Sequence, residues 1–145
     1  MIAIINGPNL NLLGRRQPEV YGTTSFEVFL KCLRERFPHT PIEYFQSNCE
    51  GEIISNLHKL GEEAMGCKGV VINPGAYSHY SYAIADAISS IDVPVVEVHI
   101  SNIMNREDFR RQSVTAQSCK GMLTGFGLEG YAMAVSFLNM ASDPV

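Results

Sequence analysis

The 145-residue sequence has no long apolar segment, no large excess of charge and few cysteines. Its apolar runs are only a handful of residues long, whereas a transmembrane helix needs about 20, so we expect no association with membranes. No basic residue precedes the apolar stretch Met1–Ile5, and Asn6 and Gly7 end it early, so we expect no signal peptide. The net charge of −4 at pH 7 gives no overall attraction to nucleic acid or to anionic membranes.

The four cysteines, Cys32, Cys49, Cys67 and Cys119, form no CxxC pair, and no histidine stands at zinc-ligand spacing from them. A chain of this length can bury a hydrophobic core without covalent cross-links. We therefore expect free thiols and a reducing, cytoplasmic location. A disulfide framework is the alternative interpretation, and a zinc site is a weaker one.

Hydrophobic residues make up 46% of the chain and charged residues 18%, which is typical of a globular domain and not of a disordered chain. Short apolar runs rich in β-branched residues alternate with longer segments whose apolar residues have helical spacing. The expected strands are 2–6, 42–46, 68–73, 94–100 and 121–125. The expected helices are 25–37, 50–65, 81–90, 107–111 and 128–140.

Buried strands that alternate with helices indicate a parallel sheet covered on both faces. Five such units are too few for a (β/α)8 barrel and suit an open, doubly wound sheet. We expect a single α/β domain over residues 1–145, flavodoxin-like, with five parallel strands in the order 2-1-3-4-5. Ligands of such sheets bind at the carboxyl ends of the strands, near the point where the strand order reverses. The segments after the first, third and fourth strands are therefore candidates for a site.

The segment 7–24, after the first strand, is far longer than the usual connection of about 2–6 residues. It carries Arg15, Arg16 and Tyr21 between two glycines, Gly14 and Gly22, that could act as the hinges of a lid. A guanidinium beside the Tyr21 phenol would favour the phenolate and lower its pKa from the usual value of about 10, which would make it a base. The alternative is a solvated basic loop that the tyrosine anchors to the core.

Glu97 and His99 lie two residues apart, on one face of the expected fourth strand. The carboxylate could hold one imidazole nitrogen and leave the other free for proton transfer. The alternative is a histidine whose hydrogen bonds are satisfied in the core.

Asn73 and His79 flank the turn after the third strand, where each could also be an ordinary turn or helix-start residue. Arg106 and Arg110 are four residues apart on the expected helix 107–111 and its approach, so both guanidiniums would point the same way. Both would face an anionic or polar ligand. The alternative is that they face solvent, in which case Glu107 would pair with Arg111.

Motifs for common cofactors are missing or misplaced. Residues 125–130 match G-x-G-x-x-G, but no later strand follows to bring an acidic residue to a ribose. The chain has no Walker loop and no G-x-S-x-G motif, and the third strand ends at Asn73 where a phospho-acceptor would be an aspartate. We therefore expect a site built from Tyr, His, Arg and Asn side chains, without a cofactor and without a metal ion.

Three segments, in order and each at the expected carboxyl end of a strand, resemble the motifs of the type II 3-dehydroquinate dehydratases: Gly7–Gly14 with Arg16 and Tyr21, Asn73–His79, and Glu97–Asn102 with Arg106 and Arg110. The resemblance covers nearly the whole chain. Gln17 stands where the family usually has Glu, which leaves one carboxylate fewer beside Arg16, and Ser78-His79-Tyr80 replaces the more usual Thr-His-Thr.

This resemblance implies a cofactor-free lyase that converts 3-dehydroquinate to 3-dehydroshikimate, in the shikimate pathway, by anti elimination of water through an enolate. It implies that Tyr21 is the base that takes the C2 proton and that Arg16 holds it as a phenolate. His99, oriented by Glu97, would protonate the departing C1 hydroxyl. Asn9 would stabilise the enolate oxygen, where negative charge develops.

The same resemblance implies how the substrate is held. Ile100 and Ser101 would meet its carboxylate, and its ring hydroxyls would contact Asn73, His79 and Arg110, with Arg106 nearby. Asp86 would reach the site from a neighbouring subunit of a homododecamer built from trimers.

Two other functions fit the same fold. One is a non-catalytic binding or assembly module that keeps the pocket without turnover, and the other is a flavin- or phosphate-binding relative. The presence of Arg16, Tyr21 and His99 together favours the enzyme, because a pure binder needs no strong base.

Overall fold

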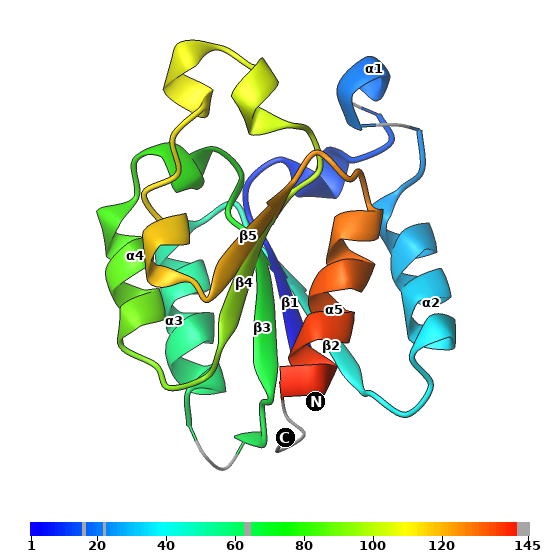
Figure 1. Ribbon diagram of the computed structural model, residues 1–145, viewed down its shortest axis with the longest axis vertical. Coiled ribbons are helices and arrows are strands. Elements are labelled where there is room, and N and C mark those ends of the chain that lie inside the picture. Colours follow the sequence, from blue (N-terminus) through cyan, green and yellow to red (C-terminus); the bar gives the residue numbers. More distant parts are fainter. Residues whose placement is uncertain (16, 22, 63–64, 142–145) are drawn as a thin grey trace.

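Figure 1 shows the computed structural model, in which the described residues are 1–15, 17–21, 23–62 and 65–141. Five strands form one parallel sheet in the order β2-β1-β3-β4-β5. They are β1 (Ile2–Asn6), β2 (Ile42–Gln46), β3 (Gly69–Asn73), β4 (Val95–His99) and β5 (Gly121–Thr124). The predicted fold class and strand order are confirmed.

Helices cover both faces of the sheet, with α2 and α5 on one face and α3 and α4 on the other (Figure 1). Their bounds are α2 (Phe26–Arg36), α3 (Glu50–Leu60), α4 (Tyr82–Ser89) and α5 (Glu129–Ala141). Serine side chains fix two of the starts: Ser25 Oγ accepts from the Val28 N–H at 3.4 Å, and Ser81 Oγ accepts from the Ile84 N–H at 3.0 Å. Such N-caps satisfy backbone donors that have no partner within the helix.

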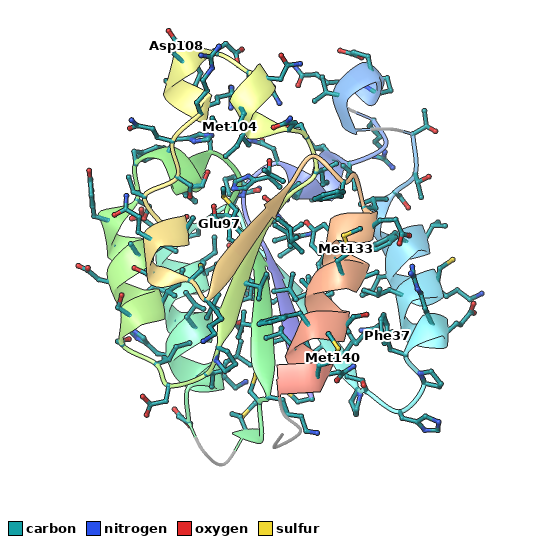
Figure 2. All side chains as sticks on the ribbon, in the orientation of Figure 1. Phe37, Glu97, Met104, Asp108, Met133 and Met140 are labelled. Atoms are coloured by element: carbon teal, nitrogen blue, oxygen red, sulfur yellow. The ribbon has the colours of Figure 1, made fainter. Side chains whose placement is uncertain are left out.

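The alternation of side chains along β1 divides the core into two layers. Ile2 and Ile4 pack towards α2 and α5, whereas Ala3 and Ile5 pack towards α3 and α4. All five residues of β1 are buried, as expected for the middle of a sheet with helices on both faces. By contrast, Met133 and Met140 lie on the exposed side of α5 (Figure 2).

No helix in the described part of the chain has the length and apolar character that a membrane span requires.

The expected helix 50–65 is too long. The helix α3 ends at Leu60, and Gly61 is its C-cap, with its N–H donating to the Leu57 carbonyl at 3.0 Å. A Cβ on Gly61 would lie 2.5 Å from Ile91 Cγ2, so this glycine allows α3 to end in close contact with the following elements. Glycine is also a poor helix former, which favours an end at this point.

The connections at the carboxyl ends of the strands contain short helices that the sequence pattern did not predict. After β1 come the 3₁₀ helix η1 (Leu10–Leu12) and the short helix α1 (Pro18–Tyr21), the latter opened by a proline, whose missing N–H costs nothing there. The expected helix 107–111 is replaced by the 3₁₀ turn η5 (Asp108–Arg110), and another 3₁₀ turn, η4 (Ile103–Asn105), precedes it.

Other 3₁₀ turns, η3 (Gly75–His79) and η6 (Ala116–Ser118), follow β3 and precede β5 respectively.

Gly7 lies where the loops after β1 and β3 touch. Its N–H donates to the Asn73 carbonyl at 2.7 Å, and a Cβ at this position would lie only 2.4 Å from the Pro74 carbonyl oxygen. Backbone atoms cannot move aside as a flexible side chain would, so the two loops can approach this closely only with a glycine at position 7.

We predict that Gly7→Ala destabilises the protein by about 1–3 kcal/mol, because the added methyl group must displace backbone. Gly51→Ala is the control: Gly51 lies in the first turn of α3, where an added Cβ has its nearest neighbour at 4.0 Å. Alanine there is expected to raise stability by up to about 1 kcal/mol. Urea denaturation of both variants checks the prediction, and a Gly7→Ala midpoint at or above that of the parent would contradict it.

Candidate active site

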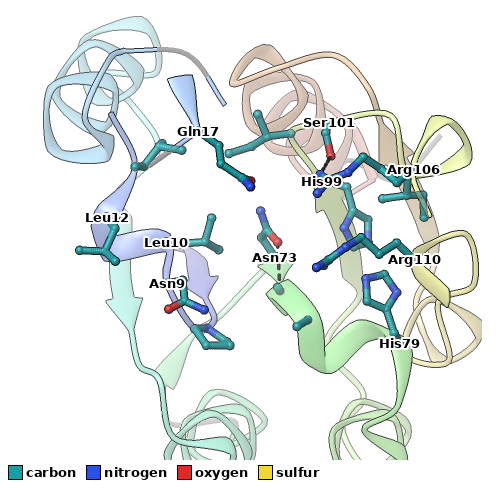
Figure 3. Close-up of a pocket in the computed structure, with 16 residues that line it drawn as sticks. Asn9, Leu10, Leu12, Gln17, Asn73, His79, His99, Ser101, Arg106 and Arg110 are labelled. Carbon is teal, nitrogen blue, oxygen red and sulfur yellow. Dashed lines mark hydrogen bonds between the residues drawn. The ribbon is translucent and has the colours of Figure 1, made fainter. Parts of the chain in front are cut away.

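A pocket opens at the carboxyl ends of β1, β3 and β4 (Figure 3). Its empty space is about 850 Å³ including the open mouth, which suits a small organic ligand. The residues that line it include eight of the predicted site residues: Asn9, Asn73, His79, His99, Ile100, Ser101, Arg106 and Arg110. The strand order therefore gathers residues that are up to about a hundred positions apart in the sequence, as such sheets do at the reversal of strand order.

His99 is held by Glu97, as the sequence predicted. His99 Nε2 lies 2.6 Å from Glu97 Oε1. Glu97 is a residue of β4 (Figure 2) and is fully buried. Because an ionised carboxylate only accepts hydrogen bonds, Nε2 is the donor of this pair. The remaining ring nitrogen, Nδ1, is thus the one that can exchange a proton with a ligand in the pocket.

Two hydroxyl groups complete the surroundings of the Glu97 carboxylate. Ser113 Oγ donates to Oε1 at 2.5 Å, and Thr115 Oγ1 donates to Oε2 at 2.6 Å. A buried charge is tolerated only when hydrogen bonds replace the lost water, and three donors do so here. The sequence analysis did not identify Ser113 and Thr115, because they come from an irregular segment with no fixed spacing from Glu97.

Asn9 has a left-handed backbone conformation, with φ of 69°, which asparagine tolerates better than most residues. The conformation is held from the loop after β2, where Asn48 Oδ1 accepts from the Asn9 N–H at 3.0 Å. Gln46 Nε2 donates to the same oxygen at 3.1 Å and to the Gly7 carbonyl at 3.2 Å. Asn48 and Gln46 thus position Asn9 at the pocket, and the sequence analysis missed both.

His79 and Arg110 form the side of the pocket opposite Asn9 (Figure 3). His79 Nδ1 donates to the Gln112 carbonyl at 2.7 Å, which leaves Nε2 for the pocket. The His79 ring lies edge-on to Phe109, with 6.3 Å between the ring centroids, and the Arg110 guanidinium carbon lies 4.7 Å from the centre of the same ring. Phe109 therefore supports both polar side chains.

Arg106 and Arg110 do not lie on one helix, which corrects the expectation. Arg106 follows η4 in an extended conformation, and Arg110 belongs to η5. The two guanidiniums are nevertheless close, because both contact the same carboxylate: the Nε atoms of Arg106 and Arg110 lie 3.7 and 3.0 Å from Glu107 Oε2. Arg106 Nη1 also donates to Ser101 Oγ at 3.1 Å.

Arg111 pairs with Asp108 at 3.2 Å, and not with Glu107 as the solvent-facing alternative implied. The pKa of Glu107 lies below its usual value, first because its own backbone N–H donates to the carboxylate and then because of the neighbouring Arg110 and Arg106. The rim of the pocket thus holds two cations around one anion.

The predicted site residues that remain are Arg16, Tyr21 and Asp86. Arg16 lies outside the described residues, and so does the side chain of Tyr21, whose backbone ends α1. Asp86 is exposed on α4 and is not among the residues that line the pocket. Gln17 does line it, with a left-handed φ of 43°, and its amide points into the cavity (Figure 3).

Within the described part of the chain, no group of three or more His, Cys, Asp or Glu residues is arranged to hold a metal ion. The four cysteines, two of them exposed, are free thiols in the structure.

Comparison with known proteins gives one consistent result. The family model described as class II dehydroquinase matches residues 1–139. The 3-dehydroquinate dehydratase of Clostridium beijerinckii is 50% identical over 141 residues, which are 96% of this chain and 95% of the relative. That of Caldicellulosiruptor saccharolyticus is 48% identical over 140 residues, or 95% of each chain.

Solved structures agree with these relatives. The type II dehydroquinase of Butyrivibrio crossotus superposes with a TM-score of 0.91 at 46% identity, covering 95% of this chain and 96% of the other. A 3-dehydroquinate dehydratase-like protein from Bifidobacterium longum gives a TM-score of 0.68 at 28% identity, covering 98% of both chains.

We predict that Thr115→Val lowers the free energy of unfolding by about 1.5–3 kcal/mol, because a hydrogen bond to a buried carboxylate is lost while the side-chain volume is kept. Thr24→Val, at an exposed position, is the matched control and should change stability by less than about 0.5 kcal/mol. Chemical denaturation measures both. Equal midpoints for the two variants would show that the Glu97 carboxylate does not depend on the threonine hydroxyl.

Proposed function

The chain belongs to the class II dehydroquinase family and is a hydro-lyase that dehydrates 3-dehydroquinate in the shikimate pathway; from this premise we propose the roles of its pocket residues. The proposal rests chiefly on one observation, the buried His99–Glu97 pair in the wall of the pocket. A histidine held by a carboxylate at one nitrogen and open to a ligand at the other is suited to general acid catalysis.

The reaction divides into removal of a proton and loss of a hydroxyl. The Tyr21 phenolate, held by Arg16, takes a proton from C2 of the substrate, and the electrons of that C–H bond form an enolate with the neighbouring carbonyl group. The enolate then forms the C1–C2 double bond and expels the C1 hydroxyl, which leaves as water with a proton from His99 Nδ1. The Glu97 carboxylate stabilises the ring while it carries the extra proton.

Support for Tyr21 as the base comes from its place in the chain. It ends α1, a helix that begins directly after Gln17, and Gln17 lines the pocket. The connection that carries Arg16 and Tyr21 thus adjoins the pocket that also contains His99, so the base and the acid come from different segments.

Other pocket residues bind the substrate and its charges. Ser101 and the backbone of Ile100 meet the substrate carboxylate, and the Arg106 guanidinium, which donates to Ser101 Oγ, adds a positive charge beside it. Asn9 stabilises the enolate oxygen, since a donor placed where negative charge develops lowers the barrier. Asn73, His79 and Arg110 bind the ring hydroxyls, and no cofactor takes part.

We predict that Tyr21→Phe lowers kcat by at least about 10²–10⁴-fold while substrate still binds, because only the proton transfer is lost. The ultraviolet absorbance of the conjugated enone product reports turnover. Tyr82→Phe, which removes the hydroxyl of an exposed tyrosine, is the matched control and should leave kcat unchanged. Turnover by Tyr21→Phe at the parental rate would contradict the assignment of the base, and folded wild-type protein without turnover would favour a non-catalytic binding module.

We further propose a cytoplasmic homododecamer built from trimers, in which Asp86 completes the site of a neighbouring subunit. The exposed thiols of Cys32 and Cys49 are consistent with a reducing compartment. Asp86 is exposed in the single chain and is not among the residues that line its own pocket, so it is available for a contact between subunits.

Sedimentation should therefore give the mass of twelve chains, and Asp86→Ala should raise KM by about 10-fold or more, as expected for a lost charged hydrogen bond. Asp92→Ala, at another exposed aspartate, should leave KM unchanged. Mixed oligomers of Asp86→Ala and His99→Ala chains should regain activity, because some sites then combine an intact His99 with an intact Asp86. No recovery on mixing would contradict a site shared between subunits.

A further inference from the structure

A line of hydrogen bonds runs through the core directly beneath the pocket. The hydroxyl of Tyr131, on α5, donates to Asn6 Oδ1 at 2.8 Å and accepts from Asn73 Nδ2 at 3.0 Å. Asn6 and Asn73 end the adjacent strands β1 and β3 and are paired in register. Tyr131 and Asn6 are both fully buried, and neither is among the residues that line the pocket, whereas Asn73 is.

The direction of these bonds fixes the orientation of the Asn73 amide. A phenol has one hydrogen, and in Tyr131 that hydrogen is used by Asn6. The Tyr131 oxygen can therefore only accept, so the NH₂ group of Asn73 must face it. The opposite end of the amide, Asn73 Oδ1, accepts from the Gly75 N–H at 3.1 Å. One Nδ2 hydrogen and one Oδ1 lone pair remain for a ligand, in known positions.

The Tyr131 ring cannot easily turn away from this arrangement. It packs edge-on against Phe26, with 5.0 Å between the ring centroids, and lies 5.9 Å from the Phe29 ring. Burial raises the pKa of the Tyr131 phenol well above its ordinary value, so the hydrogen that Asn6 accepts stays in place at neutral pH.

We propose that Tyr131 is a positioning residue for substrate binding. Its hydroxyl fixes the orientation of the Asn73 amide, and so determines how the NH₂ and oxygen ends of that amide meet a ring hydroxyl of the substrate. The inference rests on the proposed function, in which Asn73 binds such a hydroxyl. It assigns a role to a residue of helix α5 that is not among those lining the pocket. A buried hydroxyl that serves only to fill the core would leave substrate affinity unchanged when it is removed.

The test compares two Tyr→Phe variants of the full-length protein. Tyr131→Phe removes the hydroxyl that contacts Asn73. Tyr44→Phe removes the hydroxyl at the far end of the same line of bonds, where Tyr44 Oη accepts from Asn6 Nδ2 at 3.4 Å. Both keep a ring in contact with Phe26, so packing is preserved in each and only the contact with Asn73 differs.

For Tyr131→Phe we expect KM for 3-dehydroquinate to rise by about 5- to 10-fold, with kcat within about 3-fold of the parent. The contact between Asn73 and the substrate is present in both the ground state and the transition state, so weakening it reduces binding without raising the barrier from the bound substrate. Tyr44→Phe should leave both constants unchanged, and both variants should unfold at lower urea concentration. An unchanged KM in Tyr131→Phe, an equal rise of KM in both variants, or a fall of kcat with KM unchanged would each overturn the inference.

If Tyr131→Phe does not fold, Asn6→Leu gives the same test one bond further away. It removes the acceptor at similar volume, so the Tyr131 hydroxyl can turn its hydrogen towards Asn73, and only the Gly75 N–H then holds the direction of the amide. The same rise of KM is expected, and its absence overturns the inference. Wild-type protein that fails to convert 3-dehydroquinate would instead refute the proposed function.

Discussion

The bond from the Gly7 N–H to the Asn73 carbonyl, at 2.7 Å, holds together the two loops on which the pocket depends. It extends the pairing of β1 with β3 beyond the last strand residues, so the segments that carry Asn9 and Asn73 begin from one fixed point. The approach is so close that a side chain at position 7 would overlap with backbone. The geometry of the pocket is therefore set by the sheet, and the loops add side chains to a rigid edge.

Burial of charge is the second constraint. Glu97 lies at a position of β4 where a sheet covered by helices normally has an apolar side chain, and its charge is tolerated because His99, Ser113 and Thr115 all donate to it. An isolated carboxylate there would be strongly destabilising. The core therefore holds a charged carboxylate next to His99, where its charge can act on the histidine ring.

The spacing of apolar and polar residues predicted the secondary structure elements and the contacts within one strand. The number of alternating strand and helix segments predicted the doubly wound strand order, and the two-residue spacing on one strand face predicted the Glu97–His99 contact; both are confirmed. The hydroxyl partners of Glu97 and of Asn73 come from other segments of the chain, so no spacing could identify Ser113 or Tyr131. The helix expected at 107–111 is wrong, because only the short 3₁₀ turn η5 forms there, and Glu107, not a helix face, brings Arg106 and Arg110 together.

The Glu107 carboxylate at the rim has a consequence for the passage of ligands. Counting these three side chains alone, the two guanidiniums and one carboxylate leave an excess of a single positive charge. An arriving monoanion is attracted by that excess but must compete with a carboxylate that is already in place. Since dehydration leaves the carboxylate of the substrate intact, the product departs against the same reduced attraction. An internal counter-ion of this kind reduces the net positive charge that any bound anion meets at the rim.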